Sequence, residues 1–219
     1  MMRLWKLSAL LLIGVVPMLF TACTNEAYDS GDGSLSYLCV EFAEVHTSHD
    51  TIIRKATTDG GEELTFSKAI RTAWTAVPDS SYRALLYYDK ATNPVGVFSL
   101  QRVLVLSPKT TPVSEGAYPT DPLSVESIWT SESGKYVNLS LILKTGNADG
   151  IDAQQWLSLV VDPHGTDAAD LLLLHKQNGV PEYYSTRVYI SIPVSALPSG
   201  KPINLRIVTY DGEKTYRLR

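Results

Sequence analysis

Short runs in which apolar and polar residues alternate are the feature that most restricts the fold of this chain. In one run Val137, Leu139, Leu141 and Leu143 are separated mostly by polar residues. Such a period of two buries one face of a β-strand and leaves the other face more polar. Other runs of β-type composition lie at 35–45, 51–53, 95–106, 156–161, 169–175, 188–192, 203–210 and 214–218.

Turn-forming residues separate these runs at regular intervals, and patterns of amphipathic helices are few. The strongest hairpin signal is Asp211-Gly212, which stands between the last two runs. The chain is therefore expected to be all-β, and its C-terminal part is expected to form an antiparallel β-sandwich.

A segment rich in Pro, Ser and Thr divides the chain. Residues 107–122 contain four prolines, so this segment can hardly be strand or helix throughout. We therefore expect a β domain over 35–110, a Pro-rich linker over 111–122 and the sandwich domain over 123–219.

The first 22 residues have the layout of a secretory signal peptide. Arg3 and Lys6 precede an apolar run of 14 residues, 7–20, which is shorter than the roughly 20 residues that span a bilayer. Small residues then lead to Cys23. Residues 1–22 are expected to be removed and to take no part in the fold.

The end of this segment, LFTAC at 19–23, resembles the lipobox of bacterial lipoproteins, in which the cysteine is acylated and becomes the mature N-terminus. The alternative is a plain signal peptide cut near Ala22. The spacing favours an acyl anchor, such as palmitate, on Cys23. Residues 23–34 are acidic and rich in Gly and Ser, which predicts a flexible tether. No disulfide is expected, because Cys39 is then left without a partner.

The charge argues against nucleic acid as a partner. Loss of residues 1–22 leaves 17 Lys plus Arg against 23 Asp plus Glu, a formal charge of −6. A nucleic-acid binder normally carries a basic face, and no basic stretch stands out here. Contact with the membrane is expected through the lipid alone.

Four phrases carry a resemblance to a known family: GDGSLSYL at 31–38, WTAVPDSSYRALLYY at 74–88, SIWTSESGKYVNLSL at 127–141 and QNGVPEYYSTRVYISIP at 177–193. Together they resemble the NigD-like lipoproteins of the Bacteroidota. The resemblance covers nearly the whole mature chain. It implies that 35–110 is an OB-like barrel followed by the C-terminal β-sandwich, and it assigns no activity.

The resemblance also implies attachment to the outer membrane. Many family members follow the lipidated cysteine with a dense acidic run, which is linked to display on the outer surface. Here only Glu26, Asp29 and Asp32 are scattered behind Cys23. The sequence therefore leaves the periplasmic and the surface-exposed face of the membrane as alternatives.

Only one cluster invites a metal interpretation, His46-x-x-His49-Asp50. The surrounding residues predict a strand that leads into a turn. In a strand, residues three positions apart point to opposite sides. We expect a solvated loop and no metal site. Neither a G-x-S-x-G nucleophile elbow nor a phosphate-binding loop is present, so no catalytic residue and no cofactor are predicted.

Aromatic residues are the better indication of function, because exposed Tyr and Trp stack on sugars and anchor protein interfaces. Tyr183 and Tyr184 are adjacent and follow a turn at 179–181. Strand parity predicts that Tyr184 faces the core with Val188, while Tyr183 faces solvent with Tyr189. Tyr183 and Tyr189 are therefore the candidate binding surface.

These observations favour a non-enzymatic lipoprotein of the cell envelope, which acts as a binding or scaffold module for a glycan, a peptide or an envelope protein. The alternative is an envelope hydrolase or inhibitor with its site in the cleft between the two domains. A carboxylate pair, or a His close to a Ser, would favour the hydrolase. The oligomeric state does not follow from the sequence.

Overall fold

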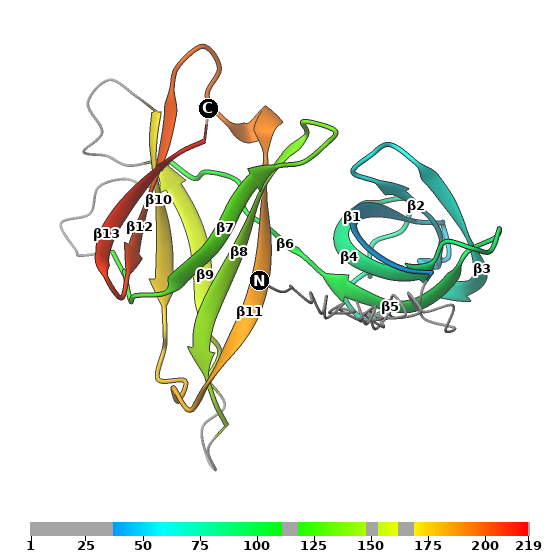
Figure 1. Cartoon of the computed structure of the whole chain (residues 1–219), viewed down its shortest axis with the longest axis horizontal. Helices are drawn as coiled ribbons and strands as arrows, with labels where there is room; N and C mark the ends of the chain where they lie inside the picture. The colour runs from blue at the N-terminus through cyan, green and yellow to red at the C-terminus, as the bar shows by residue number, and fades with distance from the viewer. Residues whose placement is uncertain (1–36, 111–117, 148–152, 162–168, 219) are drawn as a thin grey trace, which may run out of the picture. The chain divides into compact units, whose positions relative to one another are not determined.

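The computed structural model describes residues 37–110, 118–147, 153–161 and 169–218 and confirms the all-β fold class (Figure 1). Within these ranges the helical structure is a 3-10 turn, η1 (Val194–Ala196). No helix in the described ranges is long and apolar enough to cross a membrane. The strands are β1 (Leu38–Thr47), β2 (Ile53–Thr58), β3 (Glu63–Ile70), β4 (Ser81–Asp89), β5 (Gly96–Arg102), β6 (Leu104–Val105), β7 (Ser124–Thr130), β8 (Tyr136–Thr145), β9 (Trp156–Val161), β10 (Ala169–Lys176), β11 (Tyr184–Pro193), β12 (Ile203–Thr209) and β13 (Gly212–Arg217).

The first five strands form an OB-like barrel. Their order is β3-β2-β1-β4-β5, and a bridge between Phe66 of β3 and Val95, just before β5, joins the two ends of the sheet. The backbone N–H of Val95 donates to the Thr65 carbonyl over 2.8 Å at this closure. Closure of this kind removes the edge strands of a small sheet.

Alternation in the strands builds the barrel core. Residues at every second position of β1 and β4 face inward, for example Ala43, Val45 and Leu86, and they are fully buried. Burial of such apolar surface stabilises the barrel by about 25 cal/mol per Å². Trp74 and Tyr82 meet edge to face, with ring centroids 5.9 Å apart, beside this core.

Two four-stranded sheets make the sandwich, with strand orders β13-β12-β10-β9 and β6-β11-β8-β7. Leu139, Leu141 and Leu143 of β8 lie in the buried cluster between the sheets, as their alternation predicts. The opposite face of β8 is covered as well, because Asn138 and Ser140 are also buried. The sequence indicates a more polar face there but not that other residues cover it.

Two strand pairs run parallel in a sandwich that the sequence predicts as antiparallel. They are β10 with β12 and β11 with β6. Alternation specifies which side of a strand is buried but not which strand lies beside it, so the pattern could not reveal these pairs. The hairpin at Asp211-Gly212 is present, with β12 and β13 antiparallel.

Residues 104–109 contact both sheets of the sandwich. Leu104 and Val105 pair with β11, and Lys109 bridges to Val160 of β9. The sequence assigns these residues to the first domain, yet their backbone pairs with the second. The domain bounds and the linker at 111–122 stay predictions, and residues 111–117 lie outside the described ranges.

The expectation that Tyr184 is buried is wrong, because Tyr184 is 53% exposed and Tyr183 is 71% exposed. Tyr184 pairs with Thr145, which lies beyond Leu143, the last buried residue of β8. Strand parity predicts the side of the sheet to which the Tyr184 ring points. The buried core of the sandwich ends before it reaches that ring.

Truncation of Tyr184 is accordingly expected to have a small effect on stability. Tyr184→Ala should lower the free energy of unfolding by less than about 1 kcal/mol, because an exposed ring loses little buried surface. Urea unfolding followed by tryptophan fluorescence measures this. A loss above about 3 kcal/mol would mean that the ring is packed as a core residue.

Candidate functional site

A pocket of about 390 Å³ lies in the sandwich and is lined by residues of β6, β8, β9 and β11 and of the segments next to them. Leu143, Leu157 and Val188 form apolar walls from three strands, and Leu104 and Val180 add to them. The remaining lining residues are Thr145, Gly146, Asn147, Ala153, Gln154, Gln155 and Thr186. A volume of this order is typical of sites for small ligands.

Two glutamine side chains at or near this pocket are hydrogen-bonded within the chain. Gln155 donates to the Lys144 carbonyl over 2.6 Å, and its side-chain oxygen lies 3.0 Å from Nε2 of the buried His175. Gln177 donates to the carbonyls of Lys144 and Val180 over 2.9 and 2.8 Å. Because these two amides have partners and five of the lining residues are Leu or Val, the pocket favours an apolar occupant.

Two exposed tyrosines stand at the rim. A Cβ atom added to Gly146 would lie 2.8 Å from Cδ2 of Tyr183, so that ring rests directly on the pocket wall. Tyr184 lies opposite Thr145, another lining residue, in the β8–β11 ladder. The apolar pocket and two amphipathic rings together make a surface suited to a polypeptide partner.

The other predicted site residues lie elsewhere. Tyr189 is half-buried, and its ring packs edge to face on Phe42 of β1 with centroids 5.4 Å apart. Tyr189 is therefore already engaged in a contact, whereas Tyr183 is not buried. Cys23 lies outside the described residues.

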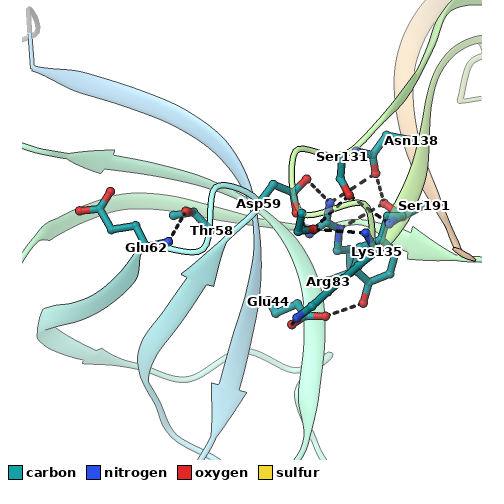
Figure 2. Close-up of polar contacts among 11 residues, drawn as sticks. Glu44, Thr58, Asp59, Glu62, Arg83, Ser131, Lys135, Asn138 and Ser191 are labelled. Atoms are coloured by element: carbon teal, nitrogen blue, oxygen red, sulfur yellow. Dashed lines mark hydrogen bonds and ion pairs between the residues drawn. The ribbon is translucent and has the colours of Figure 1, made fainter. Parts of the chain in front are cut away.

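A buried arginine joins the barrel to the sandwich (Figure 2). Arg83 of β4 faces out of the barrel, yet its side chain is only 1% exposed. Its two terminal nitrogens each donate over 2.6 Å to one carboxylate oxygen of Asp59. On the sandwich side it donates over 3.3 Å to Oδ1 of Asn138 and to Oγ of Ser191.

Aromatic rings enclose the same guanidinium group. Its central carbon lies 4.2 Å from the ring centroid of Tyr136 and 5.2 Å from that of Phe42. Phe42 in turn packs edge to face on Trp129 of β7. A desolvated cation over aromatic faces gains about 2 kcal/mol, so these rings add to the ion pair.

The turn between β2 and β3 presents Asp59 to this arginine. Gly61 has a φ of +86°, which lets the chain reverse, and the Glu62 N–H donates to Oγ1 of Thr58. The Asp59 N–H donates to the Phe42 carbonyl over 2.9 Å. The turn residues thereby hold the carboxylate in place for two parallel hydrogen bonds.

A second polar contact lies beside this cluster. Tyr136 donates its hydroxyl to Glu44 over 2.6 Å, and Lys135 donates to the same carboxylate over 3.3 Å. Burial, followed by the hydrogen bond to Glu44, raises the pKa of Tyr136 to about 12. Burial alone would raise the pKa of Glu44, but the donors Tyr136 and Lys135 outweigh it and lower that pKa.

These two shifts predict how stability depends on pH. The lowered pKa of Glu44 stabilises the fold above the usual value of 4.5, and this contribution is lost as the pH falls through the folded-state value. The raised pKa of Tyr136 stabilises the fold below pH 10 and stops doing so as the pH rises through about 12.

Glu44→Gln should lower the free energy of unfolding at pH 7 by about 1–2 kcal/mol and should flatten the loss of stability below pH 5. Urea unfolding between pH 3 and pH 8 measures both effects. A variant whose acid dependence equals that of the wild type would contradict the assignment.

The two histidines of the predicted turn region contact different residues. Nδ1 of His46 lies 2.9 Å from Oγ of Ser81, and its Nε2 lies 3.1 Å from Oγ1 of Thr57. Burial and then the charge of Lys55 lower the pKa of His46. His49 contacts Asp79 instead. Across the described part of the chain, no group of three His, Cys, Asp or Glu residues is placed to hold a metal.

Sequence reasoning did not identify Arg83 or the pocket. The one available signal was an arginine at an outward position of a strand that is otherwise apolar, YRALLYY at 82–88. Nothing in the chain near Arg83 shows that Asn138 and Ser191 cover it. The pocket residues come from four separate segments, so no local motif marks them.

Comparisons with known proteins agree with this architecture. Residues 106–219 match the family described as the NigD-like C-terminal beta sandwich domain. A NigD-like immunity protein from Bacteroides caccae is 27% identical, with a TM-score of 0.64 over 83% of this chain and 97% of that chain.

Two further solved structures share the fold. A candidate toxin-related protein from Parabacteroides distasonis is 19% identical, with a TM-score of 0.62 over 83% of this chain and 92% of that one. A candidate lipoprotein from Bacteroides fragilis is 16% identical, with a TM-score of 0.56 over 82% and 96%. No match was found among curated proteins. The family match spans more than half of the chain and agrees with the phrases noted in the sequence, so the chain belongs to the NigD-like family.

Proposed function

We propose that this chain is a non-enzymatic lipoprotein of the cell envelope that binds another polypeptide. The observation that carries the proposal is the apolar pocket at the side of the sandwich with Tyr183 and Tyr184 exposed at its rim. An apolar cavity beside exposed tyrosines is the composition found at protein interfaces. The apolar walls of the pocket, together with the hydrogen-bonded amides of Gln155 and Gln177, favour a polypeptide over a glycan.

The name of the Bacteroides caccae protein, an immunity protein, supports a more specific role. By extension from that name, the bound polypeptide would be a toxin that reaches the envelope. Balanced charge in the barrel, with eight cations and eight anions over 35–110, favours a protein partner over nucleic acid.

Site-specific photocrosslinking in cells tests the binding role. A photoreactive phenylalanine analogue at position 183 is expected to give a discrete crosslinked product that contains one envelope or secreted polypeptide. The same analogue at position 210, where Tyr210 is 46% exposed, is the control. A product at both positions, or at neither, would argue against a binding surface around Tyr183.

We further propose that Cys23 carries an acyl anchor that attaches the chain to the outer membrane. Cys23→Ala should move the protein from the membrane fraction to the soluble periplasm or block its processing. Unchanged membrane association with normal processing would contradict the anchor. Protease treatment of whole cells would then separate the periplasmic from the surface-exposed face.

A hydrolase is the second candidate, and the contact between His46 and Ser81 favours it. Against it, the other ring nitrogen of His46 contacts Thr57, whereas a catalytic triad places a carboxylate there. A fluorophosphonate probe, which labels activated serines, is expected not to react with the wild-type chain. Labelling that disappears in Ser81→Ala would establish the hydrolase instead.

A further inference from the structure

Among the described strands, none lies beside half of β11 on one of its two sides. β11 has ten residues and pairs along its whole length with β8. On the other side β6 contributes only two residues, which lie opposite Ile190 and Ser191 (Figure 1). Among the described strands, none covers this side of β11 between Tyr184 and Val188.

The hydrogen-bond pattern shows which backbone groups this open edge presents. The Leu106 N–H donates to the Ser191 carbonyl over 3.0 Å, so Ser191 directs its backbone groups toward the β6 side. Backbone direction alternates along a strand. Ser185 and Arg187 therefore direct their N–H and C=O groups to the same side, where no described strand meets them.

The other edges of the sandwich carry features that discourage strand addition. β13 bears Glu213 and Lys214, and β7 has an irregular register between Val125 and Ser127. Lys109 covers the end of β9 by pairing with Leu159 and Val161. Charges, bulges and covering segments are the usual protection of sheet edges. The open half of β11 carries one charged residue, Arg187, which is paired with Glu126. It has no bulge, and no described segment covers it.

The apolar pocket lies beside this open edge. Val188 and Thr186 of β11 line it, and so does Leu104, the first residue of β6. β6 already illustrates how a segment binds here: Leu104 packs against the sandwich core while Val105 is 41% exposed. A strand placed on the open half would direct alternate side chains in the same way, one of them into the pocket.

We propose that an extended segment of a partner polypeptide adds to the sandwich as a strand along Tyr184–Val188 and inserts an apolar side chain into the adjacent pocket. This inference rests on the proposed binding function and specifies its mode. Backbone groups that no described strand meets select a polypeptide main chain. The apolar walls select an aliphatic or aromatic residue at every second position.

The probe is a library of random octapeptides displayed on phage and selected against the mature chain from residue 23. Enriched peptides should show apolar residues at alternate positions. A synthetic peptide from this set should slow amide hydrogen exchange at Ser185 and Arg187 by tenfold or more, because both amides gain a hydrogen-bond partner.

Two variants address the backbone and the pocket separately. Ser185→Pro removes an N–H group from the open edge and none from the β8 ladder, while Thr186→Trp fills the pocket from an exposed position. Each should weaken peptide binding by tenfold or more. Thr215→Trp, at an exposed position of β13, is the matched control and should bind as the wild type does.

The outcomes separate this inference from the broader function. Absence of enriched peptides, equal binding by wild type and Thr186→Trp, or slow exchange at Ser185 and Arg187 in the free chain would each overturn strand addition. If a crosslinked polypeptide is still found at position 183, the binding function stands without this mode. If the crosslink is also absent, both proposals fail.

Discussion

Replacing Arg83 with methionine is expected to lower the free energy of unfolding by about 3–5 kcal/mol, the usual effect of removing one partner of a buried ion pair. The change leaves the Asp59 carboxylate, which is 17% exposed, without its two hydrogen bonds. It also leaves Asn138 with fewer partners, although its Nδ2 already has none among the described residues. Urea unfolding at pH 7 measures the loss.

Arg187→Met is the matched control for Arg83→Met. Arg187 forms an ion pair with Glu126, but both side chains are substantially exposed, at 50% and 40%. Solvent screens such a pair, so the control should cost less than about 1 kcal/mol. Equal effects of the two substitutions would show that the Arg83 cluster does not hold the barrel and the sandwich together.

Leu141→Ala is expected to destabilise the protein by about 3–5 kcal/mol, the upper range for truncation of a fully buried leucine. Leu141 is 0% exposed and lies in the central strand β8, opposite Val188 of β11 and Val125 of β7. Its removal leaves a cavity in the buried cluster between the two sheets.

Leu38→Ala serves as the control, because Leu38 is 39% exposed at the start of β1. It should cost under about 1 kcal/mol. Denaturant titration followed by far-ultraviolet circular dichroism reports both values. A loss of less than about 1.5 kcal/mol for Leu141→Ala would mean that the centre of the sandwich is loosely packed.

Local patterns predicted much of this fold because strands carry their own periodic signal. The alternation at 137–143 predicted β8, and Asp211-Gly212 predicted the β12–β13 hairpin. The parallel pairing of β10 with β12 was not predictable in this way. Parallel pairing depends on which strands become neighbours. Alternation within one strand does not specify its neighbour.

The candidate site was predictable only in part. Strand parity predicted that Tyr183 faces solvent, and the ring is exposed, although β11 begins only at Tyr184. Tyr184 shows the limit, since parity cannot tell where the opposite sheet ends. Arg83 shows another limit, because its burial depends on residues more than 50 positions away in the sequence.

The Arg83 cluster restricts how this protein can change by recombination. Arg83 and Asp59 belong to the barrel, whereas Asn138, Ser191 and Tyr136 belong to the sandwich. A chimera that joins this sandwich to a barrel without the arginine would bury polar groups that have lost their partner. Exchange of either half between relatives would therefore keep stability only if the new partner supplies the matching residues of this cluster.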